Sequence, residues 1–158
     1  IGTAVARRAE GLGMRVIAHD PFVRSAPPGV ALRGLDDVVE HADILSLHCP
    51  LTSENRHLIN RERLALMPQG AILVNTARGG LIDDAALVDA LQSGHLRAAG
   101  IDSFAQEPPL PELPLRGVRG IIMTPHVGGV TSDAYRNMGT AAANNVLAVL
   151  NETTEETK

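Results

Sequence analysis

The sequence predicts an α/β fold in which helices cover both faces of a doubly wound parallel sheet. Short apolar runs of strand length alternate with helical patterns along the 158 residues. Glycine and proline mark the boundaries between these segments. With 44% hydrophobic and 20% charged residues, the composition is that of a globular protein, and the length fits one domain.

Five helices are expected, over residues 1–12, 35–41, 61–67, 84–92 and 131–150. Five strands are expected, over residues 14–18, 44–47, 71–74, 96–104 and 120–123. Loops rich in proline, glycine or polar residues are predicted over residues 24–34, 51–60 and 105–118.

Local residue types justify the first half of this assignment. The first helix is rich in small side chains, which let it pack close to a sheet, and Gly11 ends it. The next strand stops before Pro21, because proline has no N–H to donate to a neighbouring strand. In the helix over residues 35–41, Val38 and Val39 share an apolar face.

Residues 70–84 are the stretch around which the chain is organised. A buried strand gives way to a turn that contains Arg78 and two glycines, and Asp83 caps the next helix. The Arg78 cation would lie at the carboxyl end of a parallel sheet, where α/β folds bind ligands. An ordinary surface arginine is the alternative, and this stretch alone does not decide between the two.

The last predicted helix begins behind Thr131 or Ser132. Apolar side chains recur on its inner face at helical spacing: Tyr135, Met138, Ala142, Val146 and Val149. Residues 1–150 are therefore assigned to one domain, and residues 151–158 to a polar tail.

Charge and composition argue against several classes of partner. A net charge of −4 and 2% aromatic residues give no reason to expect nucleic acid or an anionic membrane. No apolar run approaches the roughly 20 residues needed to span a bilayer, and no signal peptide is recognisable. The single cysteine, Cys49, excludes an intramolecular disulfide and fits a reducing compartment, so we expect a cytoplasmic protein. The histidines show no metal-ligand spacing, so no metal site is predicted.

Polar residues follow the predicted strands where each strand ends. Because the carboxyl ends of parallel strands lie along one edge of a sheet, these residues should meet at one crevice. They are Asp20, Cys49, Arg78, Asp102, Glu107 and His126.

Asp20 stands where an acidic residue can bind a nucleotide. It lies eighteen residues after Gly2, at the end of a strand, and could accept hydrogen bonds from both hydroxyls of an adenosine ribose. Its charge would repel a 2′-phosphate, which favours NAD over NADP. The alternative is a turn aspartate ahead of Pro21. Gly2 would be the last glycine of a phosphate-binding fingerprint whose other glycines are not in the chain.

His126, Glu107 and Arg78 form a chemically complete set for the reduction of a 2-oxo acid. A histidine can give and take a proton near neutral pH, and a neighbouring carboxylate orients its ring. An arginine can hold a substrate carboxylate through two parallel hydrogen bonds. Hydride would come from a nicotinamide and the proton from His126. Each residue alone has an ordinary structural explanation, and the combination favours catalysis.

Five segments of the chain match the pattern of a known family, at residues 19–22, 47–52, 73–80, 102–108 and 124–129. The run from Asn75 to Gly80, together with Glu107-Pro108 and Pro125-His126, is highly specific. On these residues the sequence resembles the NAD-binding domain of the D-isomer-specific 2-hydroxyacid dehydrogenases, and the resemblance covers nearly the whole chain.

This resemblance implies a Rossmann-like fold, with its first strand missing from the chain, that binds NAD. Arg78 would bind the carboxylate and carbonyl of a small 2-hydroxy or 2-oxo acid, and His126, paired with Glu107, would be the acid/base. Asp20 would bind the adenine ribose. Cofactor-binding roles would fall to Gly2, Asp20, Pro50, Thr76, Ala77, Asp102, Gly128 and Gly129. The family includes phosphoglycerate, glyoxylate/hydroxypyruvate and D-lactate dehydrogenases, and the sequence does not choose among them.

Because the chain starts inside the fingerprint and lacks the family's substrate-binding domain, we expect a piece of a longer enzyme, itself a homodimer. The missing strand would leave unpaired edges within the sheet. Two other hypotheses remain open. One is an NAD(H)-sensing module, as in the family's transcriptional corepressors, and the other is a catalytically inactive fragment.

Overall fold

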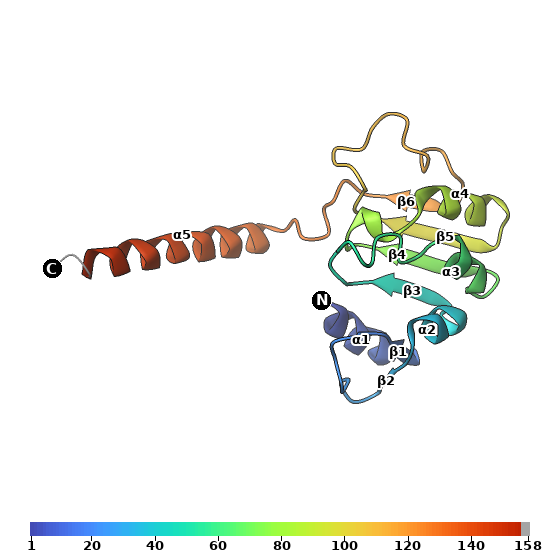
Figure 1. The fold of residues 1–158 in the computed structure, drawn as a ribbon, viewed down its shortest axis with the longest axis horizontal. Coiled ribbons are helices and arrows are strands. Elements are labelled where there is room, and N and C mark those ends of the chain that lie inside the picture. Colours follow the sequence, from blue (N-terminus) through green and yellow to red (C-terminus); the bar gives the residue numbers. More distant parts are fainter. Residues whose placement is uncertain (156–158) are drawn as a thin grey trace. The chain divides into compact units, whose positions relative to one another are not determined.

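The structure is a computed structural model that describes the backbone of residues 1–155 and the side chains of residues 1–151 (Figure 1). Contacts divide the chain into two units, Ile1–His126 and Val127–Lys158. The first unit holds every strand of the described residues. The second holds one long helix, α5, at Ser132–Glu155.

The helices of the first unit are α1 (Gly2–Gly11), α2 (Leu35–His41), α3 (Arg61–Leu66) and α4 (Asp84–Gln92), with a 3₁₀ helix, η1, at Gly79–Leu81. Its strands are β1 (Val16–Ala18), β2 (Val30–Leu32), β3 (Ile44–Leu47), β4 (Ala71–Asn75), β5 (Leu96–Ile101) and β6 (Ile121–Met123). Every predicted helix and strand is present, and α2, β3 and α4 begin and end at the predicted residues.

The prediction of a loop over residues 24–34 is wrong at its centre, where Val30–Leu32 form β2. Three residues are too few to show the alternation that marks a strand. β2 forms because it pairs in parallel with β1, with Val16 opposite Val30. β5 also ends at Ile101 rather than at residue 104, because the Phe104 N–H bonds to a side chain, that of Glu107, instead of to a strand.

The strands form two parallel sheets, β1-β2 and β3-β4-β5-β6, which are not hydrogen-bonded to each other. Among the strands that the structure describes, β1 and β3 therefore each have one edge without a neighbouring strand. On β1 the carbonyl of Ala18 bonds on the β2 side, so the backbone of Ile17 faces the free edge. On β3 the carbonyl of Asp43 bonds on the β4 side, so the backbones of Ile44 and Ser46 face the free edge. The predicted break within the sheet thus lies between β1 and β3.

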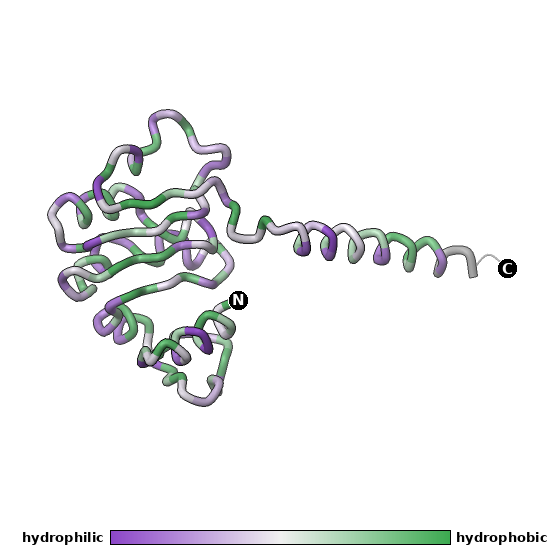
Figure 2. Tube along the Cα trace, turned by 180° about the vertical axis from the view of Figure 1, so that it is seen from behind, coloured by the Kyte–Doolittle hydropathy of each residue, from purple (hydrophilic) through white to green (hydrophobic). Residues whose placement is uncertain are grey.

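The core lies between the four-stranded sheet and the helices packed on one of its faces. Leu73 of β4, Val39 of α2 and Leu87 of α4 are all 0% exposed, and burial of such side chains stabilises the fold by about 1.5–3 kcal/mol each. α3 contacts both α2 and α4 (Figure 1). Figure 2 shows the apolar residues running along the strands of this sheet.

The opposite face of the same sheet is apolar but only partly covered. The register places Ile44, Ile72 and Ala98 in one row of this face, and Val74 and Ile122 in the next. Ile44 is 47% exposed and Ile122 is 73% exposed. We call these five residues the open sheet face.

α5 begins where predicted, because the hydroxyl of Thr131 accepts a hydrogen bond from the N–H of Ala134 at 3.0 Å. It ends at Glu155 and not at about Leu150 as predicted, so the helix continues into the residues expected to form a polar tail, and residues 156–158 lie outside the described residues. No glycine or proline follows Leu150 to stop the helix.

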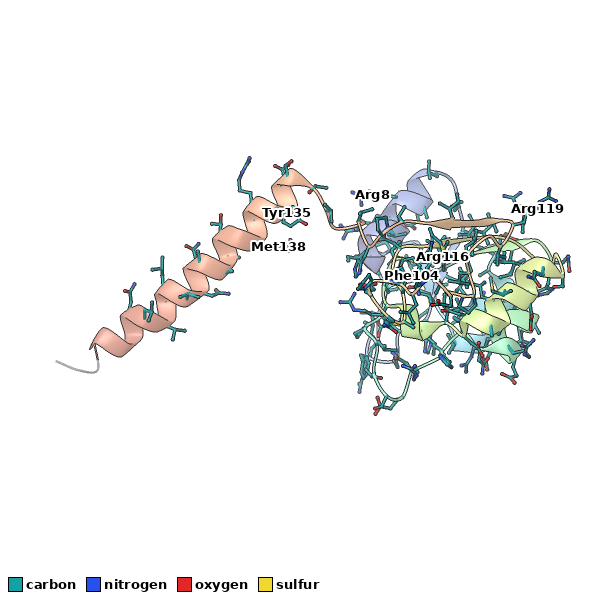
Figure 3. The ribbon with its side chains drawn as sticks, turned by 90° about the horizontal axis from the view of Figure 1, so that it is seen from above. Arg8, Phe104, Arg116, Arg119, Tyr135 and Met138 are labelled. Atoms are coloured by element: carbon teal, nitrogen blue, oxygen red, sulfur yellow. The ribbon has the colours of Figure 1, made fainter. Side chains whose placement is uncertain are left out.

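The apolar side chains of α5 keep the predicted helical spacing but are not buried. Tyr135 and Met138, labelled in Figure 3, are 61% and 57% exposed, and Val146 and Val149 are similarly exposed. The helical spacing is thus confirmed, and the burial of this face stays a prediction. None of the helices described is both long and apolar enough to cross a membrane.

Candidate active site

The turn after β4 is held by the side chain of Asn75, which is 1% exposed. Its Oδ1 accepts the N–H of Ala77 at 3.0 Å, and its Nδ2 donates to the carbonyl of Arg78 at 2.9 Å. The Arg78 side chain is exposed, and its Nη1 donates to the carbonyl of Ala77 at 2.7 Å. No role was predicted for Asn75 from the sequence, although an amide directly after an apolar run is a turn signal.

Gly79 allows the Arg78 turn to approach the loop after β5. A Cβ on Gly79 would overlap the backbone of Phe104 and Ala105, so no other residue fits without moving that loop. Figure 3 labels Phe104 in this region. Gly80 is less constrained, because its Cβ would meet only the flexible end of the Leu51 side chain, at 2.8 Å.

Glu107 and His126, which are far apart in the sequence, are in contact. His126 Nδ1 lies 2.8 Å from Glu107 Oε2, and an ionised carboxylate can only accept, so Nδ1–H is the donor. The other oxygen, Glu107 Oε1, accepts the N–H of Phe104 at 2.9 Å. The Nε2 of His126 is therefore the ring nitrogen that remains for proton exchange with a substrate.

The hydrogen bond from His126 and that from the Phe104 N–H lower the pKa of Glu107 below its usual range, and the nearby Arg78 charge adds to this effect. Glu107 is therefore ionised at neutral pH and in mild acid. The three predicted catalytic residues thus lie in one neighbourhood, which the positions of their strands in the sheet predicted.

The backbone of His126 is in the left-handed region, with φ of 55°. This conformation is uncommon for any residue other than glycine, and such strain gathers at functional sites. The N–H of His126 bonds to the carbonyl of Thr124 at 2.9 Å, which helps to fix the ring beside Glu107.

Asp102 follows β5 and is only 5% exposed. The hydroxyl of Thr124, directly after β6, donates to Asp102 Oδ1 at 2.5 Å. The N–H of Asp102 bonds to the carbonyl of Asn75, so β4, β5 and β6 are all connected at this edge. Thr124 is a second residue for which the sequence predicted no role.

Asp20 lies at the same edge, at the end of β1. One of its carboxylate oxygens, Oδ1, accepts a hydrogen bond from the N–H of Phe22 at 2.9 Å. This bond is typical of a turn aspartate, which was the alternative interpretation of Asp20. The residue is exposed, so a turn role and a ligand role are compatible. Burial raises the pKa of the Cys49 thiol, and the charge of Asp20 raises it further. Because a thiol with a raised pKa is mostly protonated, Cys49 is a poor nucleophile. The effect of Asp20 on Cys49 also indicates that the ends of β1 and β3 are near each other.

The first residue of α1, Gly2, lies against the end of β3. A Cβ on Gly2 would be 3.3 Å from the Cβ of His48, so the small residue permits this close contact. Burial lowers the pKa of His48. Pro50 is exposed in the next loop, and its carbonyl accepts a hydrogen bond from Asn55 at 2.7 Å.

The remaining predicted cofactor residues fall into two groups. Thr76 is exposed and Ala77 half-buried in the turn after β4, beside Arg78. Gly128 and Gly129 belong to the second unit, so their positions relative to the other site residues are not described.

The residues present fit a dinucleotide. An exposed acid, Asp20, follows β1, and Gly2 stands at the start of α1, against the end of β3. An arginine and a histidine–glutamate pair follow the strands at the other end of the sheet. This combination of an open parallel sheet with acid/base and anion-binding groups at its carboxyl edge defines a dehydrogenase-type nucleotide-binding domain.

Residues 1–128 match the model of the D-isomer specific 2-hydroxyacid dehydrogenase family, NAD binding domain. The chain belongs to this family. The fold and the cofactor implied by the resemblance are thereby confirmed.

Curated relatives include a D-3-phosphoglycerate dehydrogenase of Mycobacterium tuberculosis, 45% identical over 153 residues, which are 95% of this chain and 29% of the relative. A hydroxypyruvate reductase of Thermotoga maritima is 45% identical over 141 residues, 88% of this chain and 46% of the relative. Among solved structures, the NAD complex of a D-isomer specific 2-hydroxyacid dehydrogenase from Lactobacillus delbrueckii ssp. bulgaricus is 32% identical. Its TM-score is 0.87, over 96% of this chain and 50% of that one. The chain thus spans half or less of the length of these proteins.

Proposed function

We propose that this chain is the cofactor domain of an enzyme that transfers hydride between NAD(H) and a D-2-hydroxy acid or 2-oxo acid. The observation that carries the proposal is the 2.8 Å contact between His126 and Glu107, beside the Arg78 turn. A structural histidine has no need of an ionised partner at the ligand-binding edge of the sheet.

In the reduction, Arg78 holds the carboxylate and carbonyl of the 2-oxo acid, and its charge polarises the carbonyl. NADH supplies the hydride when bound. His126 gives a proton from Nε2 to the carbonyl oxygen, while Glu107 stabilises the protonated ring through Nδ1–H. In the oxidation, His126 Nε2 takes the proton from the hydroxyl group.

The cofactor roles are proposed residue by residue. Asp20 binds the adenine ribose and so selects NAD over NADP, and Pro50 lines the adenine pocket. Thr76 and Asp102 place the nicotinamide. The further positions proposed to contact the cofactor are Gly2, Ala77, Gly128 and Gly129.

Residues 1–150 are proposed as the cofactor domain, with the substrate-binding domain outside this chain. The parent enzyme is proposed to be a cytoplasmic homodimer that binds neither nucleic acid nor membrane. The net charge of −4 supports the absence of nucleic-acid and membrane partners, and the single cysteine supports the cytoplasmic location. Named relatives act on phosphoglycerate and hydroxypyruvate, and neither substrate is favoured here.

The rival hypothesis is a module that senses NAD(H) without turnover. The two differ in one experiment: the whole protein is mixed with NADH and a panel of 2-oxo acids, and both binding and oxidation are followed by absorbance and fluorescence. We expect binding and oxidation with at least one acid, and a preference for NADH over NADPH. Binding without oxidation of NADH by any acid would favour the sensor.

A further inference from the structure

Thr124 bonds to three parts of the candidate site. Its N–H donates to the carbonyl of Ile101 at 3.0 Å, and its hydroxyl donates to Asp102 Oδ1 at 2.5 Å. Its carbonyl accepts the N–H of His126 at 2.9 Å. One residue at the end of β6 therefore touches the cofactor side of the site through Asp102 and the proton-transfer side through His126.

The hydrogen bond from the Thr124 hydroxyl joins the buried Asp102 carboxylate to a side chain with restricted rotation. Asp102 is 5% exposed, so the orientation of its carboxylate is set by protein groups, and Thr124 is one of them. The distance of 2.5 Å is in the range of bonds to an ionised acceptor, which are about twice as strong as neutral ones. Threonine is β-branched and restricted at χ1, so it holds its hydroxyl in a defined direction.

These bonds form part of a closed ring. From Asp102 the ring passes through Thr124 to His126, then through Glu107 to the N–H of Phe104, which is two residues after Asp102. The ring joins the ends of β5 and β6 and the loop between them. A shift of Thr124 would therefore move the acid and the histidine together.

We propose that Thr124 is a positioning residue that fixes Asp102 and His126 relative to each other. The hydride and the proton are then transferred to the same carbonyl group. This inference rests on the proposed function, because it assigns Asp102 to the nicotinamide side. Thr124 itself need not touch cofactor or substrate. It acts through the carboxylate that it orients.

The test uses Thr124→Val in the whole protein, which removes the hydroxyl and keeps the branched shape. Without the hydroxyl, the Asp102 carboxylate loses a hydrogen bond that orients it toward the nicotinamide side. If the energy of that bond is lost from cofactor binding, the Kd of NADH, measured by fluorescence, should rise by about 10- to 100-fold. Thr124→Ser keeps the donor and should bind within about threefold of wild type. The control Thr140→Val, in the exposed part of α5, should leave the Kd unchanged.

A double-mutant cycle separates this role from a merely structural one. If Thr124 acts through Asp102, then adding Thr124→Val to Asp102→Asn should change the Kd by less than about twofold. In the Thr124→Val variant, NADH deuterated at the transferred position should give a larger isotope effect on kcat, because hydride transfer becomes more rate-limiting. If Thr124→Val does not fold, Thr124→Ala removes the same donor and adds no atom.

NADH binding and isotope effects equal to wild type in the valine or alanine variant would overturn the inference while leaving the proposed function intact. Independent, multiplicative effects of Thr124→Val and Asp102→Asn would overturn it as well. Failure of the wild-type protein to bind NADH would overturn both the inference and the proposed function.

Discussion

At the scale of single residues, the proposed chemistry depends most on the contact between His126 and Glu107. Its side chains are 42% and 38% exposed, so water screens the pair and its energy is modest. The pair orients the imidazole ring of His126. Because Nδ1 is hydrogen-bonded to Glu107, Nε2 is the nitrogen proposed to exchange a proton with the substrate. The hydrogen bonds from His126 and from the Phe104 N–H lower the pKa of Glu107, which favours its ionised form.

The pair predicts a pH effect in the whole enzyme. A neighbouring carboxylate favours the protonated imidazole, which is the form needed for reduction. Glu107→Gln removes this charge, so the upper limb of the pH–activity profile should move to lower pH. Steady-state reduction rates across pH measure the shift. Glu112→Gln, in the same loop, should leave the profile in place, and an unchanged profile for Glu107→Gln would argue against the pair.

At the scale of elements, the strand-to-helix connection after β4 is fixed by sterics. Gly79 lies where a Cβ would overlap the backbone of Phe104 and Ala105, and that loop carries Glu107. The spacing between the Arg78 turn and Glu107 thus depends on the absence of a side chain. Glycine is needed at position 79 for lack of space and not for its backbone conformation, because Gly79 is not in the left-handed region.

Gly79→Ala should destabilise the fold by about 1–3 kcal/mol, the usual cost of overpacking, and should lower turnover more than NADH affinity. Gly80→Ala is the matched control, because its Cβ would meet only the movable end of Leu51. Thermal unfolding and kinetics of both variants provide the comparison. Equal, small effects of the two substitutions would contradict the close approach inferred for Gly79.

Elements with a strong local signal could be predicted from the sequence, and those made by tertiary pairing could not. α4 has a capping Asp83, whose carboxylate accepts the N–H of Ala86 at 3.1 Å, and its bounds were predicted correctly. β2 has no such signal and exists through its pairing with β1. The end of α5 was misplaced because polar residues after Leu150 resemble a tail but contain no helix breaker.

The same distinction applies to the site. The motif residues Arg78, Glu107 and His126 could be found because each follows a predicted strand. Asn75 and Thr124 act through hydrogen bonds to partners whose positions depend on the fold, so their residue types alone do not reveal a role. The second oxygen of Glu107, bonded to the Phe104 N–H, is likewise visible only in the structure.

At the scale of the whole molecule, the two sheets leave strand edges unpaired and apolar side chains exposed. β1 and β3 have free edges, and the open sheet face exposes Ile44 and Ile122. Unpaired edges and contiguous apolar surfaces both favour association with other chains. We therefore expect the 158-residue chain, produced alone, to self-associate.

Ile122→Lys places a charge on the β6 side of the open sheet face, where the exposed fraction of the native side chain is 73%, and should reduce this association. Light scattering coupled to size-exclusion chromatography, over a range of concentrations, measures the change in average mass. Leu110→Lys, which replaces a side chain 50% exposed in the loop before β6, serves as the control and should have no effect. Association that Ile122→Lys leaves unchanged would assign it to another surface.

The most direct test of the proposed activity is Arg78→Ala in the whole enzyme. Loss of a charge-assisted clamp on the substrate carboxylate should lower kcat/KM by about a hundredfold or more, while the Kd of NADH stays within about twofold of wild type. Arg119→Ala, an exposed arginine before the amino end of β6 (Figure 3), is the matched control and should change neither value. Equal losses of kcat/KM and NADH affinity in Arg78→Ala, or no loss of kcat/KM, would contradict the role of Arg78 and with it the proposed hydride-transfer site.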